Sequence, residues 1–364
     1  MTVLHVVPAR PFGGMQRIAA LLAAAQRRSG LDAHVLAIYD SVEFLDLLER
    51  YDVPHIFLHS SCPNFRAVRH CHEVLARDWS VVHVHGGLLW SNTVALFAKR
   101  SPVVYHAHNY PPLDRSLKTR VLNRVNRSLV DVVIAVSKDV ARAWRVAGLD
   151  SAVECVYNAV DLPNAAKPDR LPRSTDSPVF GMATRLAKDK GIFEFLDVAE
   201  AIHAQRSGAR FVIAGEGPER SKLEEETNRR GLSGVFFFPG YIRDLDAFWS
   251  GIDIALFTAA KEPFGLRILE AIVRGVPVAA YLTGAGSDEI LCLGLTAVTA
   301  KYGDVPSLAE NSLALCDDAS LYKQITDAAY DDVSARFSTA AMRDGVARMY
   351  DWLTGSVTNP SPLF

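Results

Sequence analysis

Two glutamates stand eight residues apart in the stretch KEPFGLRILEAIVRGVP, residues 261–277. Apolar residues at helical spacing predict a helix that begins at Gly265-Leu266 and ends at the closing Gly-Val-Pro. A helix N-terminus carries free N–H groups and a positive dipole end, so it suits a phosphate better than a carboxylate. Glu262 before the helix and Glu270 within it could instead accept hydrogen bonds from hydroxyl groups on either side of such a phosphate. From the spacing alone, the simpler interpretation is that Glu262 is a surface acid and Glu270 a capping-turn residue on an amphipathic helix.

A second candidate group is the pair of cations in TRLAKDKG, residues 184–191. An apolar run typical of a strand precedes them, and an apolar helical pattern follows. Arg185 and Lys190 would therefore lie in the loop between a strand and a helix, where cations can face a diphosphate. Because Arg and Lys are common in loops, this pair alone is weak evidence for a site.

Histidines end two strand-like runs, VVHVHGG at 81–87 and VVYHAHN at 103–109. His106 and His108 alternate along the second run and therefore share one face of a strand. Paired histidines can bind a metal ion, but no third ligand is spaced near them. A hydrogen-bonded structural histidine is the more frequent case. The sequence therefore predicts no metal site.

Alternating strand-like and helical patterns position all of these residues. Strand-like runs are predicted at 3–7, 33–38, 55–58, 81–85, 103–107, 132–136 and 153–157 in the first half. The second half repeats the alternation, with runs in PVFGMATRL, ARFVIAGEG, VFFFPGY, DIALFTA and VPVAAYL. Continuous apolar strands separated by helices indicate parallel sheets covered on both faces. In such sheets ligands bind beyond the carboxyl ends of the strands, where the candidate residues are expected.

A proline-rich segment divides the chain. Residues 163–178 combine several prolines with Lys, Arg, Asp and Ser, which is a composition typical of a linker. The sequence therefore predicts an N-terminal domain at 1–162, a linker at 163–178 and a C-terminal domain at 179–339. The last helix, within 340–364, is expected to return toward the first domain before a short tail.

The net charge of −2 over 364 residues argues against a nucleic-acid-binding protein, which would carry a basic excess. Five cysteines are scattered and never spaced C-x-x-C, which argues against a disulfide framework and a zinc site. A reducing, cytoplasmic setting fits this usage. No apolar run reaches the ~18 residues that span a bilayer, and the N-terminus lacks the pattern of a signal peptide. The sequence predicts a soluble or peripheral protein.

Basic residues cluster from Arg115 to Arg127 in the amphipathic helical pattern DRSLKTRVLNRVNRSLV, residues 114–130. A core-facing helix with a solvated basic face explains this pattern. The alternative is a peripheral contact with an anionic membrane, or a surface for a lipid-pyrophosphate acceptor.

Together, these motifs resemble a known family. The stretch from Glu262 to Glu270 resembles the E-x7-E signature of glycosyltransferase family 4, which comprises retaining sugar transferases with the GT-B fold. The run from Gly181 through Arg185 to Lys190 resembles the phosphate-binding loop of that family. Weaker matches follow in the family's order at Gly13-Gly14, His108-Asn109, Gly215-Glu216-Gly217-Pro218 and Gly240-Tyr241. The resemblance implies two Rossmann-like α/β domains whose parallel sheets face a central interdomain cleft.

The same resemblance implies metal-independent, retaining transfer of a sugar from a UDP- or GDP-sugar to an acceptor hydroxyl, without a cofactor. Glu262 and His108 would orient the donor sugar, and Glu270 would bind the ribose. Arg185 and Lys190 would stabilise the leaving diphosphate. Further groups expected to bind the donor are Gly13, Gly14, Gly215, Tyr241, Gly265 and Leu266. The N-terminal domain would bind the acceptor, expected to be a glycan or lipid-linked saccharide of a cell-surface polysaccharide pathway, and the C-terminal domain the nucleotide-sugar.

Three positions depart from the family pattern, so the resemblance does not define which residues form the sugar pocket. Asn109 stands where aspartate is common, Arg267 replaces an apolar residue, and residues 283–289 differ from the usual glycine-rich run. Alternatives are an epimerase or phosphorylase on the same fold, and a non-catalytic nucleotide-sugar-binding protein. A dinucleotide-dependent oxidoreductase is disfavoured, because no strand leads into G-x-G-x-x-G.

Overall fold

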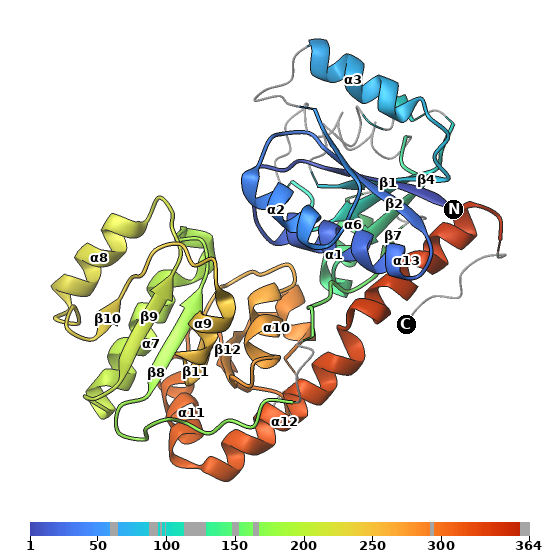
Figure 1. The fold of residues 1–364 in the computed structure, drawn as a ribbon. Helices are drawn as coiled ribbons and strands as arrows, with labels where there is room; N and C mark the ends of the chain where they lie inside the picture. Colours follow the sequence, from blue (N-terminus) through green and yellow to red (C-terminus); the bar gives the residue numbers. More distant parts are fainter. Residues whose placement is uncertain are drawn as a thin grey trace. The chain divides into compact units, whose positions relative to one another are not determined.

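The computed structural model describes residues 1–58, 65–86, 94, 97–98, 100–112, 129–147, 153–162, 167–291 and 295–356. The chain divides into two compact units, each drawn in Figure 1. Unit 1 comprises Met1–Asp161 and Ser338–Phe364, and unit 2 comprises Leu162–Phe337. Each unit is an α/β domain built on a parallel sheet, as the sequence pattern predicted.

The sheet of unit 1 has the strand order β3-β2-β1-β4-β5-β6-β7, and neighbouring strands run parallel. The strands are β1 (Thr2–Val7), β2 (Asp32–Ala37), β3 (His55–Phe57), β4 (Val81–His85), β5 (Val103–Ala107), β6 (Val132–Ala135) and β7 (Val153–Cys155). β4, β5 and β6 are buried along their whole length. Strands covered on both faces are normally continuous apolar runs, so the histidines in β1, β4 and β5 are exceptions that need a structural reason.

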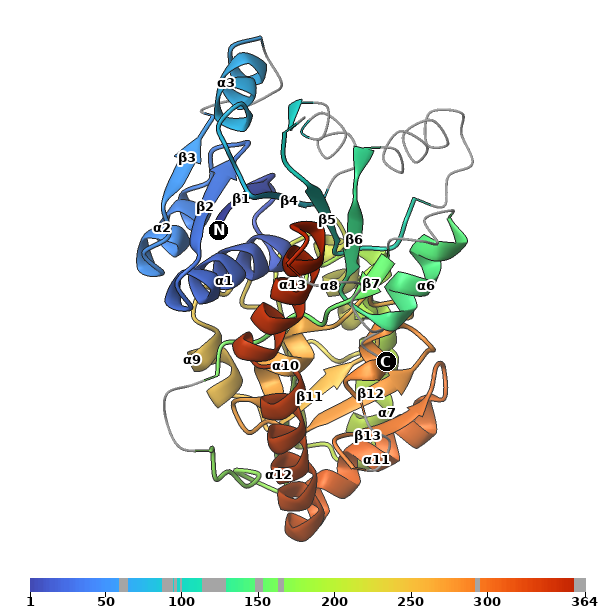
Figure 2. The same cartoon turned by 90° about the vertical axis from the view of Figure 1, so that its right-hand side faces the viewer.

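The described helices of unit 1 are α1 (Gly14–Arg28), α2 (Val42–Arg50), α3 (Phe65–Leu75), α6 (Lys138–Val146) and α13 (Thr339–Leu353). Three of them begin after a serine, Ser41, Ser137 or Ser338. In each case the serine hydroxyl accepts a hydrogen bond from the N–H three residues later. α13 packs against α1, and Figure 2 shows these two helices side by side over the sheet. This packing brings residues near the end of the chain to the strands at its beginning.

The sheet of unit 2 has the strand order β10-β9-β8-β11-β12-β13. The strands are β8 (Val179–Ala183), β9 (Arg210–Ala214), β10 (Phe236–Phe237), β11 (Ile254–Phe257), β12 (Val278–Leu282) and β13 (Val298–Lys301). The helices are η1 (Lys188–Lys190), α7 (Ile192–Gln205), α8 (Arg220–Arg229), α9 (Leu245–Ser250), α10 (Leu266–Ile272), η2 (Gly286–Glu289), α11 (Val305–Asp317) and α12 (Ala319–Arg336). Phe180, Phe195 and Phe211 are fully buried in the core between this sheet and its helices.

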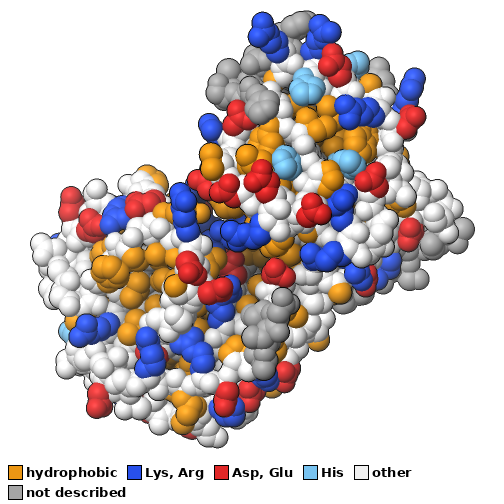
Figure 3. Space-filling model, in the orientation of Figure 1, with side chains coloured by type: hydrophobic (Ala, Val, Ile, Leu, Met, Phe, Trp, Pro, Cys, Tyr) orange, Lys and Arg blue, Asp and Glu red, His pale blue; other side chains and the backbone are white. Residues whose placement is uncertain are grey.

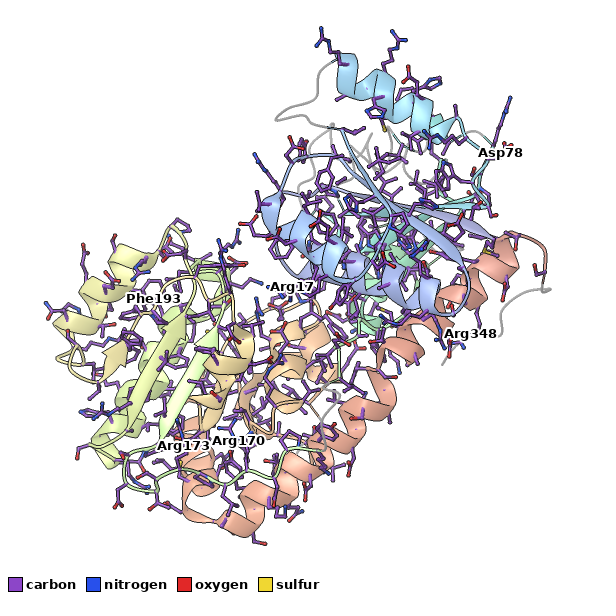
Figure 4. All side chains as sticks on the ribbon, in the orientation of Figure 1. Arg17, Asp78, Arg170, Arg173, Phe193 and Arg348 are labelled. Carbon is purple, nitrogen blue, oxygen red and sulfur yellow. The ribbon has the colours of Figure 1, made fainter. Side chains whose placement is uncertain are left out.

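The segment 167–178, which has the composition of a linker, lies on unit 2. Arg170 donates to the carbonyl oxygens of Trp249 at 3.0 Å and Ile252 at 2.9 Å. Arg173 pairs with the buried carboxylate of Asp253 at 2.9 Å. Figure 4 labels Arg170 and Arg173, which lie near each other in this segment. These contacts hold the segment against the body of unit 2.

The strand order of each unit reverses direction beside its first strand, between β1 and β4 in unit 1 and between β8 and β11 in unit 2. In open parallel sheets, ligands bind beyond the carboxyl ends of the strands at such a switch point. The loops that follow these strands are therefore where functional side chains are expected.

Candidate active site

The candidate site of unit 2 lies at the carboxyl ends of β8 and β11. The loop after β8 carries Arg185 and Lys190, and the loop after β11 carries Glu262. The Thr258 hydroxyl joins the two loops by donating to the carbonyl oxygen of Gly191 at 2.6 Å. Gly191 has a φ of +71°, and a Cβ at this position would overlap the backbone of Thr258. A residue with a side chain could not make this close approach.

Lys190 and Glu262 form an ion pair as a result of that approach. Lys190 Nζ donates to Glu262 Oε2 at 2.9 Å, and the two side chains are 24% and 29% exposed. The backbone of Glu262 is also held, because the Ser287 N–H donates to its carbonyl oxygen at 3.1 Å. The pair presents a cation and a hydrogen-bond acceptor at one point. This combination suits a ligand that carries both phosphate and hydroxyl groups.

Arg185 lies in the same loop but nearer to solvent. Its side chain is 64% exposed, and its Nη2 is 3.4 Å from Asp189 Oδ1. Exposed ion pairs of this kind contribute little to stability. The Arg185 guanidinium can therefore exchange Asp189 for another anion at small cost.

Glu270 lies on α10, which begins after Gly265 in a left-handed conformation with φ of +101°. The helix starts at Leu266 and is seven residues long, so it ends before the Gly-Val-Pro where the sequence pattern places its end. Arg267 Nη1 donates to Glu270 Oε2 at 2.5 Å. The Glu270 side chain is only 13% exposed, so a cationic partner matters to its carboxylate. The residue that departs from the apolar pattern, Arg267, thus supplies the counter-charge.

Gly215 holds neighbouring strand ends together. It has a φ of +139°, and a Cβ there would overlap the carbonyl oxygen of Thr184 in the loop after β8. Its N–H donates to the carbonyl oxygen of Gly240, after β10, at 2.8 Å. Close packing alone therefore requires glycine at this position, whether or not a ligand binds above it. Tyr241 follows Gly240 and is 50% exposed.

Residues 283–289, which depart from the glycine-rich pattern of the family, form a turn closed by a carboxylate. Asp288 Oδ2 accepts from the N–H groups of Thr283 at 2.9 Å and Gly284 at 2.7 Å. The turn continues into η2, whose Ser287 contacts the backbone of Glu262. This segment therefore helps to position Glu262.

In unit 1, Gly13 and Gly14 lie where the loop after β1 meets α1. Gln16 Oε1 accepts from the Gly13 N–H at 3.0 Å, and Gln16 Nε2 donates to the carbonyl oxygen of Pro8 at 2.6 Å. One buried side chain thus joins the two ends of this loop and sets its shape.

Five histidines gather on one face of the sheet of unit 1. The register of β1, β4 and β5 places His5 beside His83 and His85 beside His106, and alternation adds His108. Ring nitrogens lie within 4.8 Å of one another in two groups, His5-His83-His85 and His85-His106-His108. A third possible ligand, His85 on the neighbouring strand, therefore does lie near His106 and His108, contrary to the expectation from the sequence.

The geometry of these rings favours hydrogen bonding over metal binding. Nitrogen–nitrogen distances are 3.0 Å for His5 to His85, 3.2 Å for His83 to His106 and 3.1 Å for His85 to His108. The rings of His83 and His85 are stacked at 6°, and those of His106 and His108 at 21°. The in-plane lone pairs of stacked rings lie in separate, nearly parallel planes, so they cannot meet at one ion. Each three-histidine group contains at least one such stacked pair.

All five rings are held neutral at pH 7. Burial lowers the pKa of His5 to about 4 and that of His108 to about 3. Burial, followed by repulsion from neighbouring imidazoles, holds the pKa of His83, His85 and His106 well below the ordinary 6.5. Four of the rings are fully buried, and His108 is partly exposed. A neutral ring donates one hydrogen bond and accepts another, so the tautomer of His108 decides what it can contact.

Sequence reasoning brought Lys190 and Glu262 to one site but missed several side chains that hold the candidate residues. Thr258 gives no signal in the sequence. Gln26 on α1 contacts His5, 21 positions earlier, and Tyr350 on α13 contacts His83, 267 positions earlier. His5 was visible as the only polar residue in the apolar run 3–7, and a polar residue in a fully buried strand was a usable signal.

The basic stretch from Arg115 to Arg127 lies outside the described residues. Figure 3 shows acidic and basic side chains interspersed over the visible surface of each unit. Among the described helices, none has the length and apolar character needed to span a bilayer.

Two family models match the chain, "Glycosyltransferase Family 4" over residues 12–163 and "Glycosyl transferases group 1" over residues 164–332. The chain is 28% identical over 292 residues to 2-deoxystreptamine N-acetyl-D-glucosaminyltransferase of Streptomyces fradiae. The match covers 72% of this chain and 69% of that protein. It is 26% identical over 180 residues to the lipopolysaccharide core biosynthesis glycosyltransferase LpsE of Rhizobium meliloti, which covers 50% of this chain and 52% of that protein.

The crystal structure of HepE from Anabaena, in complex with UDP and glucose, matches with a TM-score of 0.82 at 22% identity. The match covers 96% of this chain and 99% of that chain. The two family models meet near the boundary between the two units, and each unit has the parallel, Rossmann-type strand order. The chain belongs to the family 4 (group 1) glycosyltransferases, has the GT-B fold, and is a glycosyltransferase.

Proposed function

We propose that the protein is a retaining, metal-independent transferase that moves a sugar from a UDP-sugar to an acceptor hydroxyl. The observation that carries this proposal is the Lys190–Glu262 pair at the switch point of the unit 2 sheet. UDP is preferred to GDP because the similar HepE structure contains UDP and glucose.

The chemistry requires stabilisation of negative charge. Breaking the anomeric C–O bond leaves a nucleoside diphosphate, and cations placed beside it lower the barrier. Lys190 and Arg185 would take phosphate oxygens in place of their carboxylate partners, Glu262 and Asp189. Glu262 would stay in position through its backbone bond to Ser287 and accept hydrogen bonds from the sugar hydroxyls. In this scheme the protein supplies the counter-charge itself, so no metal is needed.

Recognition of the rest of the donor follows the same assignment. Glu270 would accept hydrogen bonds from the ribose hydroxyls, either beside its bond to Arg267 or in exchange for it. Tyr241 would border the base, and His108 would orient the donor sugar. The backbone at Gly13, Gly14, Gly215, Gly265 and Leu266 would make the remaining contacts. Unit 1 would bind the acceptor and unit 2 the nucleotide-sugar.

The acceptor is proposed to be a glycan or lipid-linked saccharide of a cell-surface polysaccharide, which the likeness to LpsE supports. The likeness to a 2-deoxystreptamine N-acetyl-D-glucosaminyltransferase supports a second candidate, a small aminocyclitol. Incubation with a UDP-sugar and each acceptor class, followed by mass spectrometry, separates the two. A glycosylated aminocyclitol without a glycosylated saccharide would replace the first candidate by the second.

A cytoplasmic location and a peripheral contact with anionic membranes through Arg115–Arg127 complete the proposal. Sedimentation with anionic liposomes should be strong at low salt, weak at high salt and absent with neutral liposomes. Binding that is insensitive to salt and lipid charge would remove the membrane contact from the proposal.

Substitution of Glu262 by alanine tests the site directly. Glu262→Ala should abolish transfer and leave the circular dichroism spectrum unchanged. Glu226→Ala is a matched control, because Glu226 on α8 is similarly exposed at 24% and is paired with Arg229 and Arg230. The control should keep the wild-type rate. Wild-type transfer by Glu262→Ala would remove Glu262 from the site.

Ligand-induced stabilisation tests the donor class. UDP at 100 times its Kd should add about 2.7 kcal/mol to the free energy of unfolding, which a thermal-shift assay detects readily. The shift should be the same with and without a chelator. A larger shift with GDP would correct the nucleotide, and a shift lost on chelation would contradict metal independence.

A further inference from the structure

A branched hydrogen-bond network in unit 1 ends at His108, and its other members have no part in the proposed transfer. Gln26, on α1 and 1% exposed, lies at the branch point. One branch runs through His5 and His85 to His108, and the other through Tyr350 and His83 to His106. The strands β1, β4 and β5 and the helices α1 and α13 that carry these residues are labelled in Figure 2.

The distances around Gln26 define the orientation of its amide. Gln26 Oε1 lies 2.7 Å from His5 Nε2, and Gln26 Nε2 lies 3.3 Å from the Tyr350 hydroxyl. In this orientation the amide oxygen faces His5 and the amide nitrogen faces the Tyr350 hydroxyl. The 2.7 Å contact fits a ring N–H that donates to an amide oxygen. His5 therefore carries its hydrogen on Nε2.

The tautomer of His5 propagates along the first branch. A neutral ring with hydrogen on Nε2 has a bare Nδ1, so His5 Nδ1 accepts from His85 Nε2 at 3.0 Å. By the same rule, His85 Nδ1 accepts from His108 Nε2 at 3.1 Å. The branch ends at His108 with a protonated Nε2 and a bare Nδ1.

The second branch is consistent with the first. Burial raises the pKa of Tyr350, so its hydroxyl keeps its hydrogen. The hydroxyl accepts from Gln26 and donates to His83 Nδ1 at 2.5 Å. His83 Nε2 then donates to His106 Nδ1 at 3.2 Å. The branch ends at His106 Nε2, which is buried and has no hydrogen-bond partner among the described residues. All five rings thus carry hydrogen on Nε2.

We propose that Gln26 sets the tautomer of all five histidines and thereby presents His108 Nδ1 as a fixed hydrogen-bond acceptor. A bare Nδ1 accepts hydrogen from a hydroxyl group and cannot donate one, so it selects a sugar hydroxyl and not a carbonyl or phosphate oxygen. Reversal of the Gln26 amide would move the hydrogen of every ring from Nε2 to Nδ1, and His108 would then offer an N–H at the same point. The inference rests on the proposed function, in which His108 borders the donor sugar. Gln26 is a positioning residue, because it acts through His5 and His85.

Nuclear magnetic resonance of the full chain labelled with ¹⁵N-histidine tests the proposal, because protonated and bare ring nitrogens give well separated signals. In the wild-type protein at pH 7, His108 should show hydrogen on Nε2 and none on Nδ1. Its signals are identified by their loss in His108→Asn. Hydrogen on Nδ1 of His108, or on both nitrogens, would overturn the proposal. Binding of one equivalent of added Zn²⁺ by these rings would also overturn it.

Two truncations of the network form a matched pair. Gln26→Met removes the branch point at similar volume, so signals with hydrogen on Nδ1 should appear at His5, His85 and His108. Tyr350→Phe leaves the bond from His5 to Gln26 intact, so only the signals of the second branch should change. Gln26→Met should also lower kcat/KM for the donor by about two- to tenfold, as expected for one weakened hydrogen bond. A Gln26→Met spectrum identical to wild type would show that Gln26 does not set the tautomers.

The spectra require no sugar donor, so the two proposals can fail separately. A wrong tautomer at His108 would overturn this inference and leave the transferase proposal standing. The expected tautomer in a protein that transfers no sugar from any UDP-sugar would leave the network intact and overturn the proposed function.

Discussion

The side chains of Lys190 and Glu262 are each about three-quarters buried, and their charged groups are bonded to one another. Loss of one partner leaves the other partly desolvated charge without compensation, which costs more than loss of an exposed pair. A ligand that carries both phosphate and hydroxyl groups can replace the contact without leaving either charge unpaired. The pair therefore connects ligand binding to the local stability of the two loops.

Substitution of Lys190 separates its role toward the ligand from a general effect of charge. Lys190→Met should lower kcat about a hundredfold, because one contact to the developing charge is lost. Lys167→Met is a matched control, since Lys167 is 30% exposed and pairs with Asp331 at 2.9 Å elsewhere in unit 2. The control should transfer at the wild-type rate in the same steady-state assay. An equal loss in both variants would contradict a specific role for Lys190.

The loops after β8, β9 and β10 act as one element because their backbones are in contact. Gly215 lies at the centre, with its N–H bonded to Gly240 and its Cα against the carbonyl of Thr184. Such contacts are possible only where no side chain intervenes. The position of Arg185 and Lys190, in the loop that begins at Thr184, therefore depends on a glycine that bears no functional group.

Gly215→Ala should destabilise unit 2 by about 2–4 kcal/mol, because the added methyl overlaps Thr184 and the backbone is left-handed. Gly234→Ala is the matched control, since a Cβ at Gly234 meets no atom within 4 Å. The control should change the free energy of unfolding by less than about 0.5 kcal/mol. Urea denaturation of both variants measures the difference. Equal stability of the two variants would contradict this prediction and show that the loops after β8 and β9 can move apart to accept the methyl group.

On the scale of the whole molecule, histidines are unevenly divided. Ten of the eleven precede residue 109, in the part of the chain that forms unit 1, and unit 2 contains only His203. The five clustered rings have pKa values lowered in the folded state, with His5 at about 4 and His108 at about 3. The unfolded chain binds protons below pH 6.5, and the folded unit does not until well below that value. Acid therefore favours the unfolded state of unit 1.

Unit 1 should consequently open at a higher pH than unit 2. At pH 5 each buried histidine costs roughly 2 kcal/mol relative to pH 7, so five cost about 10 kcal/mol, comparable with the usual stability of 5–15 kcal/mol for a domain. Hydrogen exchange, corrected for the intrinsic effect of pH, should show protection lost between pH 6.5 and 4 in peptides from residues 1–161 first. Earlier loss in peptides from 179–337, or equal protection of unit 1 at pH 5 and 7, would contradict this expectation.

Several residues of the candidate site could be singled out because they follow apolar strands and have types suited to one chemistry. The predicted strands 81–85 and 103–107 have the observed bounds, although histidines interrupt the apolar run that burial on both faces normally demands. Lys190 and Glu262 could be singled out from their motifs, but the ion pair between them could not be predicted. Their contact requires β8 and β11 to be neighbours, and strand order is not a property of either segment.

The sequence by itself determined the alternation of elements, the parallel sheets and the loops that carry the candidate residues, because hydrophobic periodicity is local. The tertiary structure alone decided which polar groups meet. Gln26 and Tyr350 are 324 positions apart and join only because α13 packs on α1. The third nitrogen beside His106 and His108 comes from a neighbouring strand. Such contacts depend on lateral register and helix docking, which are set by the summed packing of the unit and leave no mark in a local pattern.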